Sequence, residues 1–259
     1  MLPKYDHREF LPTNHEIGDG KWIGPDNIVE YQKNLAANGD WHYAHKQVTY
    51  QTNSFGYRCK EFTNVDWNES IVIFGCSLVY GVGLAYDETI GYHLSNLLQM
   101  PVVNMGVCAS SMIYALQNQL VLTEKYAKPK AVINLWTGLN RLTYFEHDRP
   151  ALLGPWGNRS GIYKDLMPFY NEWSRSDDNA SMYGLIAQKA AKHLWSDTTY
   201  YEATFFDWTA AALGCRQFDI LDKARDMFHP GPATAHSVAS ELAKEICKMG
   251  NEDKNTIDK

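Results

Sequence analysis

Three short apolar runs, each separated from the next by a stretch with helical spacing, constrain the fold of this chain more than any other feature. The runs cover residues 71–74, 101–106 and 131–136. Uninterrupted apolar runs of this length are typical of strands that are buried on both faces of a parallel sheet. Their alternation with helices therefore predicts an α/β fold, a three-layer α/β/α sandwich built on a parallel sheet.

The segments between and after these runs predict the helices of the sandwich. Apolar residues recur at intervals of three and four over 87–100, where Asp87 is a possible helix cap, and over 110–128. A clear helix is also expected over 182–195, and a closing helix is indicated around 238–246. Residues 218–221, Phe-Asp-Ile-Leu, predict one further strand.

Composition along the chain suggests the domain boundaries. Residues 1–68 are rich in aromatic residues, Asn, Gly and Pro without a sustained period, which indicates an irregular arm packed on the core. The α/β domain is expected over 69–250, with an aromatic-rich insertion at about 141–217 and a loose tail over 251–259. The tryptophans and tyrosines of the insertion fit either internal packing or stacking on a ligand.

The charge and hydropathy of the chain exclude several function classes. The net charge is -6 and the Lys and Arg residues are not clustered, so no nucleic-acid partner is expected. No apolar segment reaches the roughly 18 residues that would suggest a membrane span, and the first residues lack a secretory pattern. We therefore expect a cytoplasmic protein that does not bind membranes.

The cysteines favour a reducing compartment. They are five in number and form no Cys-x-x-Cys pair, so neither a disulfide framework nor a zinc knuckle is indicated. No metal and no cofactor is expected. The five are Cys59, Cys76, Cys108, Cys215 and Cys247.

Residues able to do chemistry follow the predicted strands. Ser77 comes just after the first strand, Gly106 ends the second, and Asn140 follows the third. Asp226 and His229 precede the last helix, and the Asp-x-x-His spacing supplies a base and its orienting carboxylate in one segment. Because reactive groups gather at the carboxyl ends of parallel strands, all five are expected at one edge of the sheet.

Each of these residues also has a structural interpretation. A serine at a strand end is commonly a helix cap, and a histidine before a proline is commonly a loop residue at the surface. Gly106 fits a tight turn as well as a backbone N–H donor, and Asn140 fits a cap as well as an amide donor. Cys76 is a second possible nucleophile, but its side chain is expected to point away from that of Ser77.

Four blocks of residues, in this order, resemble the signature blocks of the SGNH (GDSL-like) hydrolase family; they are 75–78, 104–106, 138–140 and 226–230. The resemblance runs over about 71–243 with a gap at the insertion, and residues 53–58, Asn-Ser-Phe-Gly-Tyr-Arg, resemble a lead-in segment of some members. It implies the flavodoxin-like SGNH hydrolase fold. In one departure, Cys76 stands where the family has an aspartate.

The resemblance also implies an activity and the roles of the residues. Ser77 would be the nucleophile, His229 its general base and Asp226 the residue that orients the imidazole. The oxyanion hole would consist of the backbone N–H groups of Ser77 and Gly106 and the side chain of Asn140. The predicted protein is a serine esterase that hydrolyses a small O-acyl ester, with an acetyl group on a carbohydrate as one candidate. A catalytically impaired module that binds a glycan or a protein, and an acyltransferase using the same site, are the alternatives.

Overall fold

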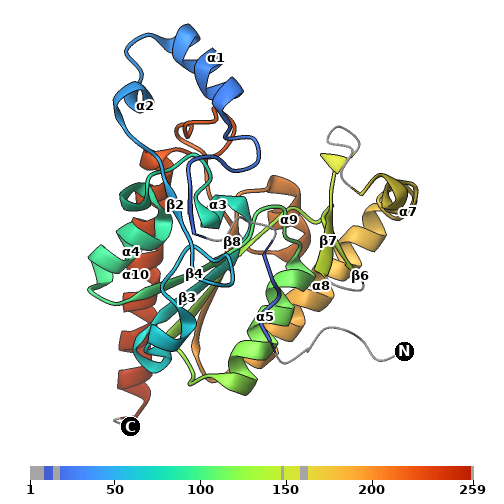
Figure 1. Cartoon of the computed structure of the whole chain (residues 1–259). Helices are drawn as coiled ribbons and strands as arrows, with labels where there is room; N and C mark the ends of the chain where they lie inside the picture. The colour runs from blue at the N-terminus through green and yellow to red at the C-terminus, as the bar shows by residue number, and fades with distance from the viewer. Residues whose placement is uncertain (1–8, 14–17, 147–148, 158–162, 258–259) are drawn as a thin grey trace.

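A parallel sheet of five strands forms the centre of the computed structural model, which describes residues 9–13, 18–146, 149–157 and 163–257 (Figure 1). Counted along the chain, the strands lie in the order 2-1-3-4-5, which is the flavodoxin-like order of doubly wound sheets. The first three occupy the predicted apolar runs. The strands are β3 (Ile71–Gly75), β4 (Val102–Gly106), β5 (Ala131–Trp136), β8 (Thr199–Thr204) and β9 (Arg216–Gln217).

The central strands are apolar throughout because both of their faces are covered. In β3, Val72 and Phe74 point into one hydrophobic cluster, whereas Ile71 and Ile73 point into a second cluster on the opposite face. This alternation follows from the two-residue repeat of an extended chain. An apolar residue at every position therefore signals a layer of helices on each side of the sheet.

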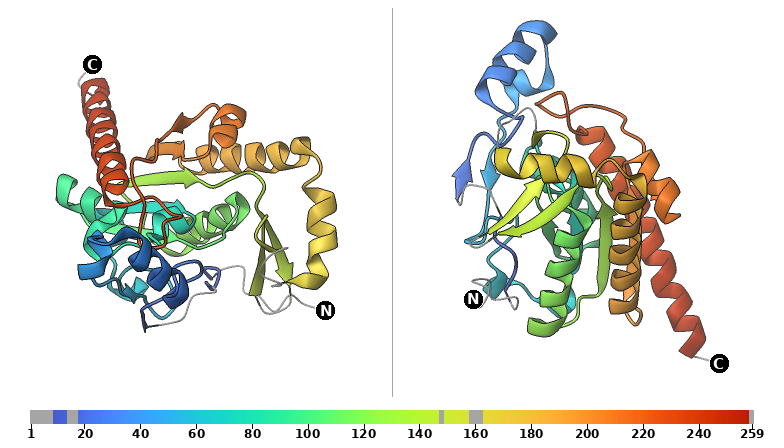
Figure 2. Two further views of the ribbon diagram at one scale, coloured as in Figure 1. Left: turned by 90° about the horizontal axis from the view of Figure 1, so that it is seen from above. Right: turned by 90° about the vertical axis from the view of Figure 1, so that its right-hand side faces the viewer.

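Helices pack on both faces of the sheet, as the three-layer prediction requires (Figure 2). Helices α4 (Ile90–Leu98) and α10 (Pro232–Ile257) lie together on one face. Helices α5 (Met112–Lys125) and α8 (Asp177–Leu194) lie together on the other. The predicted α/β/α sandwich is confirmed.

Three predicted details are corrected. Thr89, not Asp87, caps α4, because its Oγ1 accepts the N–H of Tyr92 at 3.3 Å. Residues 218–221 form no strand, because the N–H of Leu221 is donated to the hydroxyl of Thr234 at 2.8 Å and not to a neighbouring strand. Helix α10 continues to Ile257 through most of the expected tail, where the sequence has several good helix formers and no proline.

The amino-terminal arm is more ordered than its composition indicates. Phe10 packs against Phe62 and Trp67 in one of the core clusters, so this part of the arm completes the domain. Asn27 caps a helix that sequence reasoning missed, by accepting two backbone N–H groups. The elements of the arm are β1 (Asp19–Gly20), α1 (Ile28–Asn38), α2 (His42–His45), β2 (Tyr50–Gln51), η1 (Phe62–Asn64) and η2 (Trp67–Glu69).

Much of the predicted insertion belongs to the sandwich itself, since β8, β9 and α8 all lie within 141–217. The part outside the sandwich is a hairpin of β6 (Leu142–Glu146) and β7 (Arg149–Leu153), followed by η4 (Lys164–Leu166) and α7 (Met167–Trp173). A second short helix, α9 (Asp207–Leu213), follows β8.

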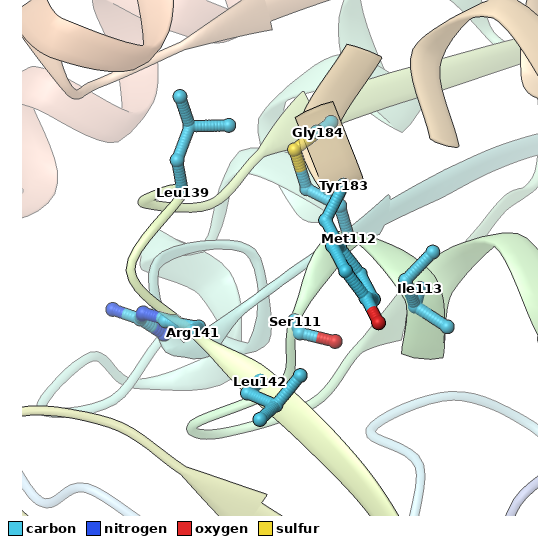
Figure 3. Close-up of a pocket in the computed structure, with 8 residues that line it drawn as sticks. All are labelled: Ser111, Met112, Ile113, Leu139, Arg141, Leu142, Tyr183 and Gly184. Atoms are coloured by element: carbon cyan, nitrogen blue, oxygen red, sulfur yellow. The ribbon is translucent and has the colours of Figure 1, made fainter. Parts of the chain in front are cut away.

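A small pocket lies where the start of α5, the segment after β5 and α8 meet (Figure 3). Its walls include Ser111, Met112, Leu139, Arg141 and Tyr183. None of the helices in the described ranges is both long enough and apolar enough to cross a membrane.

Candidate active site

Ser77 lies where β3 passes into the short helix α3 (Ser77–Tyr80). Gly75 makes the sharp exit from the strand possible. A Cβ at this position would lie 2.4 Å from the Val79 side chain and 2.8 Å from the carbonyl oxygen of Leu135. Only a glycine fits this close approach of backbone and side chain, and the turn that it permits places Ser77 at the carboxyl edge of the sheet.

The side chains of Ser77, His229 and Asp226 form a continuous hydrogen-bonded chain. The Oγ of Ser77 lies 2.8 Å from Nε2 of His229, a residue 152 positions away. Nδ1 of the same imidazole lies 2.5 Å from Oδ2 of Asp226. The three residues are 7, 6 and 8% exposed, respectively, so the chain is largely shielded from water. The structure thus brings together a hydroxyl, an imidazole and a carboxylate that the sequence placed in two distant blocks.

The Asp226 carboxylate is held in its ionised form by its surroundings. Its Oδ1 accepts the backbone N–H groups of Phe228 at 3.0 Å and of His229 at 2.9 Å. Burial alone would raise the pKa of Asp226, but the hydrogen bonds from the His229 side chain and from two backbone N–H groups outweigh burial and hold this pKa below its ordinary value. An ionised Asp226 accepts the proton on Nδ1, which leaves Nε2 free to accept the hydrogen of Ser77.

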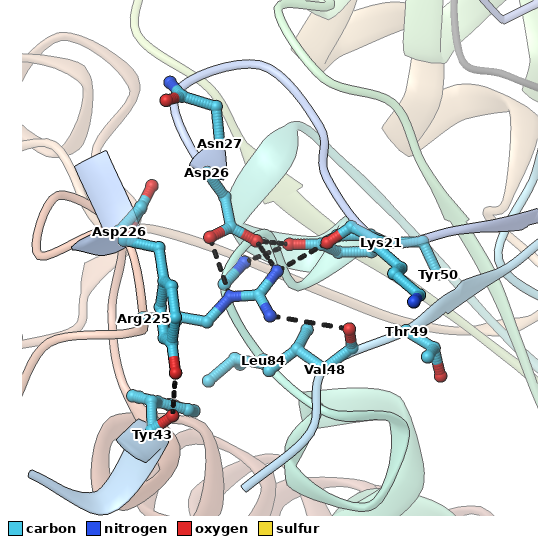
Figure 4. A network of polar contacts seen from close by, with 12 residues as sticks. Lys21, Asp26, Asn27, Tyr43, Val48, Thr49, Tyr50, Leu84, Arg225 and Asp226 are labelled. Atoms are coloured by element: carbon cyan, nitrogen blue, oxygen red, sulfur yellow. Dashed lines mark hydrogen bonds and ion pairs between the residues drawn. The ribbon is translucent and has the colours of Figure 1, made fainter. Parts of the chain in front are cut away.

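The loop that carries His229 is anchored to the amino-terminal arm through Arg225 (Figure 4). Arg225 donates from Nε to Oδ1 of Asp26 at 2.9 Å and from Nη2 to Oδ2 at 2.7 Å. The hydroxyl of Tyr50 donates to the same carboxylate. Burial and the neighbouring Asp26 raise the pKa of Tyr50 above its ordinary value, so this hydroxyl keeps its proton. Sequence reasoning missed this network, which is built one residue away from Asp226.

Gly83 connects this network to the loop after α3. Its N–H donates to the Tyr50 hydroxyl at 2.7 Å, and its carbonyl accepts the N–H of Arg225 at 3.0 Å. The backbone of Gly83 has a φ of 78°, in the region that favours glycine. A Cβ there would lie 2.7 Å from the Cβ of Ala224 and 3.0 Å from the nitrogen of Arg225. The residue must therefore be glycine for the two loops to meet.

Arg58, from the predicted lead-in segment, supports the same loop from the other side. It is 2% exposed, and its guanidinium donates to backbone carbonyl oxygens at 2.8–3.2 Å. Burial lowers the pKa of this group, which has carbonyl groups and tyrosine rings around it. Arg58 thus fixes the backbone just after Ser77. The accepting residues are Thr49, Tyr80, Gly81 and Leu84.

The structure contradicts one predicted donor of the oxyanion hole. The N–H of Gly106 is donated at 2.9 Å to the side-chain oxygen of Asn104, within the same strand, and is not open to a substrate. Gly106 is instead needed for packing, because a Cβ there would lie 2.5 Å from the nitrogen of Tyr80.

Ala109, in the loop after β4, offers an alternative donor. It has a φ of 64°, which is uncommon for a residue other than glycine, and within the described ranges its N–H donates to no acceptor. The loop lies against the end of β3, since the N–H of Val107 and the hydroxyl of Ser110 both donate to the carbonyl oxygen of Gly75, at 3.0 and 3.2 Å. Sequence reasoning chose the glycine of this block because glycines commonly approach ligands closely.

Asn140 lies just beyond the carboxyl end of β5, as predicted. Its backbone carbonyl accepts the hydroxyl of Tyr170 at 2.8 Å, which fixes the main chain. Its partly buried side chain makes no hydrogen bond to any part of the chain that the structure describes. The amide is therefore available to a bound molecule.

The cysteine beside Ser77 has no part in this hydrogen-bonded chain. Cys76 is 2% exposed and its side chain makes no capping hydrogen bond to α3. No disulfide bond joins any of the five cysteines, all of which lie in the described ranges. Burial raises the pKa of nearby Cys108, so that thiol is a poor nucleophile.

Comparisons with known proteins give structural similarities only. No protein-family model and no curated protein matches the sequence. Among solved structures, a carbohydrate esterase family 2 enzyme with a carbohydrate-binding domain from Corynascus thermopiles (Myceliophthora fergusii) is 15% identical, with a TM-score of 0.39 over 70% of this chain and 66% of that one. An acetyl xylan esterase from Butyrivibrio proteoclasticus is 9% identical, with a TM-score of 0.41 over 72% of this chain and 65% of that one.

A third structure is a lipolytic protein of the G-D-S-L family from Veillonella parvula. It is 12% identical, with a TM-score of 0.38, and the match covers 69% of this chain and 96% of that one. The fold is described by its own sheet, which is parallel with the flavodoxin-like strand order 2-1-3-4-5. At these identities and TM-scores, the question of activity depends on the geometry of the site itself.

Proposed function

We propose that this chain is a serine ester hydrolase with Ser77 as its nucleophile. The observation that supports the proposal is the buried chain of contacts from Ser77 Oγ to His229 Nε2 at 2.8 Å and from His229 Nδ1 to Asp226 Oδ2 at 2.5 Å. A hydroxyl, an imidazole and a carboxylate in this order are the parts of a nucleophile activated by a general base.

The proposed reaction has two halves. Nε2 of His229 takes the proton of Ser77 while Oγ forms a bond to the carbonyl carbon of the ester. The imidazolium then gives this proton to the departing alcohol, which leaves an acyl group on Ser77. In the second half, water loses its proton to Nε2 and attacks the acyl carbon, and Ser77 recovers its proton as the acid departs. Asp226 stabilises the imidazolium in both halves.

Three groups are proposed to bind the oxyanion that forms at the carbonyl oxygen. They are the backbone N–H of Ser77, the side-chain amide of Asn140 and, in place of Gly106, the backbone N–H of Ala109. The two backbone donors are held by the main chain before the substrate arrives, and the hydrogen bond from Tyr170 fixes the main chain of Asn140. A preorganised donor of this kind typically contributes about a hundredfold or more to the rate.

The substrate that we propose is a small O-acyl ester, with an acetyl ester on a carbohydrate as the first class to test. The resemblance of the sequence blocks supports a short acyl group. A panel of acetyl to octanoyl aryl esters, together with acetylated sugars, would rank the acyl groups and the alcohols separately.

The test of this proposal is the hydrolysis of 4-nitrophenyl acetate by the wild-type protein and by Ser77→Ala. We expect kcat/KM to fall by about 10³-fold or more in Ser77→Ala. Ser240→Ala is the matched control, because the Ser240 hydroxyl donates to the carbonyl oxygen of His236 within helix α10, and this variant should keep the wild-type rate. Equal rates in Ser77→Ala and the wild type would remove Ser77 from the mechanism.

A second candidate function is a binding module that keeps the fold without the reaction. Cys76, in the position where the family has an aspartate, is the observation that favours it. A serine-reactive fluorophosphonate separates the two functions, because labelling of Ser77 requires an activated hydroxyl. A folded wild-type protein that takes no label would favour the binding module. Product analysis with an added alcohol would distinguish acyl transfer from hydrolysis.

A further inference from the structure

Arg141 occupies an unusual position beside the proposed active site. It follows Asn140 directly at the carboxyl end of β5. Its guanidinium carbon lies 5.1 Å from the ring centre of Trp156 and 5.6 Å from that of Phe206. Figure 3 shows the guanidinium turned away from Met112 and Tyr183 on the opposite wall of the pocket. Two aromatic rings thus hold a cation at the edge of the sheet.

The guanidinium of Arg141 has no polar partner in the part of the chain that the structure describes. Its Nη1 is buried without a hydrogen bond, and no carboxylate pairs with the group. The guanidiniums of Arg58 and Arg225 differ in having polar partners, since Arg58 donates to four backbone carbonyls, with only its Nε unpaired, and Arg225 pairs with Asp26. A buried and unpaired donor is costly to a fold unless a ligand satisfies it. Arg141 is therefore suited to an acceptor that comes from outside the chain.

The same region of the structure connects Arg141 to the residues of the proposed mechanism. Gly138 lies close to both the Asn140 side chain and the Phe206 ring, since a Cβ at its position would lie 3.0 Å from the side-chain oxygen of Asn140 and 3.7 Å from the ring. Phe206 is one of the two rings that hold Arg141. Strand β5 is also the direct neighbour of β3, which leads into Ser77. The guanidinium and the proposed nucleophile thus belong to one edge of the sheet.

We propose that Arg141 binds a carboxylate or phosphate group of the substrate, so that the natural substrate is an anionic ester. This inference rests on the proposed function and names the substrate class. A guanidinium is planar and can donate two parallel hydrogen bonds to either anion. The rings of Trp156 and Phe206 hold the plane of the group without using any of its N–H donors.

The experiment compares 4-nitrophenyl acetate with 4-nitrophenyl hemisuccinate, which carries a carboxylate on its acyl group. The measured quantity is the ratio of kcat/KM for the anionic ester to that for the neutral ester. We expect Arg141→Met to lower this ratio on the order of 10- to 100-fold, the usual effect of losing a charge-assisted hydrogen-bonded pair. Arg141→Lys keeps the charge without the paired donors and should give an intermediate ratio.

Arg175→Met is the matched control. Arg175 is exposed and pairs with Glu172, so its loss removes one positive charge away from the site and should leave the ratio unchanged. Inhibition by succinate and by inorganic phosphate then distinguishes the two anions, because the natural group should resemble the stronger inhibitor. A ratio that is the same in the wild type, Arg141→Met and Arg141→Lys would overturn the inference, and hydrolysis of the neutral ester would still support the esterase.

A direct binding measurement covers the case in which neither ester is hydrolysed. Succinate and inorganic phosphate are titrated by calorimetry into the wild type, Arg141→Met and Arg141→Lys, after circular dichroism and thermal melting have shown that each variant is folded. Binding that weakens about tenfold or more in Arg141→Met supports an anion site without the esterase. Equal binding to all three proteins, or no binding to any of them, refutes it.

Discussion

The buried ion pair between Asp26 and Arg225 should govern both the stability of the fold and the activity of the site. Asp26 is 1% exposed, and its carboxylate accepts two hydrogen bonds from Arg225 and one from Tyr50. Arg225 directly precedes Asp226 in the chain. In Asp26→Asn the shape of the side chain is nearly kept, but its negative charge is lost.

The expected size of the effect follows from the burial of both partners. Removal of one partner leaves the Arg225 guanidinium buried without a counter-charge, and such changes cost about 3–5 kcal/mol. This is a large part of the roughly 5–15 kcal/mol that stabilises an ordinary domain. Because Asp26 holds the loop that carries Asp226 and His229, we also expect kcat to fall at temperatures where Asp26→Asn is still folded.

Urea unfolding of a double-mutant cycle measures the interaction directly. Asp26→Asn, Arg225→Met and the double variant are compared with the wild type. The double variant should lose less than the two single variants added together, because it leaves no unpaired buried charge. Glu172→Gln, which removes the exposed pair with Arg175, is the control and should have a far smaller effect. A loss below about 1 kcal/mol in Asp26→Asn, with an unchanged kcat, would refute a positioning role for the arm.

Three further outcomes are expected. Gly83→Ala should lower the unfolding free energy by more than about 1 kcal/mol and should also lower kcat, because the new Cβ would meet the backbone of Arg225. Melting curves would show the first effect and ester hydrolysis the second. Asn140→Ala should lower kcat about a hundredfold with little change in KM, and a change in KM alone would make the amide a binding group for the ground state. The depressed pKa of Asp226 means that its carboxylate stabilises the fold above its ordinary pKa of 3.8, and that this contribution is lost as the pH falls through the lower folded value. The unfolding free energy of Asp226→Asn should therefore decline less than that of the wild type below about pH 4, and parallel declines would count against this account.

The sheet was predictable where burial makes a strand apolar on both faces, and not where polar side chains find partners inside the fold. Strand β5 is apolar at nearly every position and was predicted with its observed bounds. Strand β8 contains Glu202, whose carboxylate accepts hydrogen bonds from Trp136 at 3.0 Å and from Gln188 at 2.6 Å. These partners come from other elements, so β8 lacks the continuous apolar run by which β3 and β5 were predicted.

The residues of the candidate site that lie in short sequence blocks were predictable, whereas the contacts that depend on distant parts of the chain were not. Ser77, Asp226 and His229 lie in short blocks with a recognisable spacing, which allowed sequence reasoning to propose all three as members of one site. Asp26 lies 199 positions from Arg225, and nothing near it in the sequence indicates the pair. The assignment of Gly106 was wrong for a related reason, since the side chain of Asn104 that takes its N–H also depends on the fold.

The ion pair between Asp26 and Arg225 limits how this protein can be engineered. A loop grafted over residues 222–231 from another hydrolase would bring an imidazole but no guanidinium at position 225, and the Asp26 carboxylate would stay buried without a counter-charge. The arm and the loop therefore have to be exchanged as a pair, although 199 positions separate Asp26 from Arg225 in the chain.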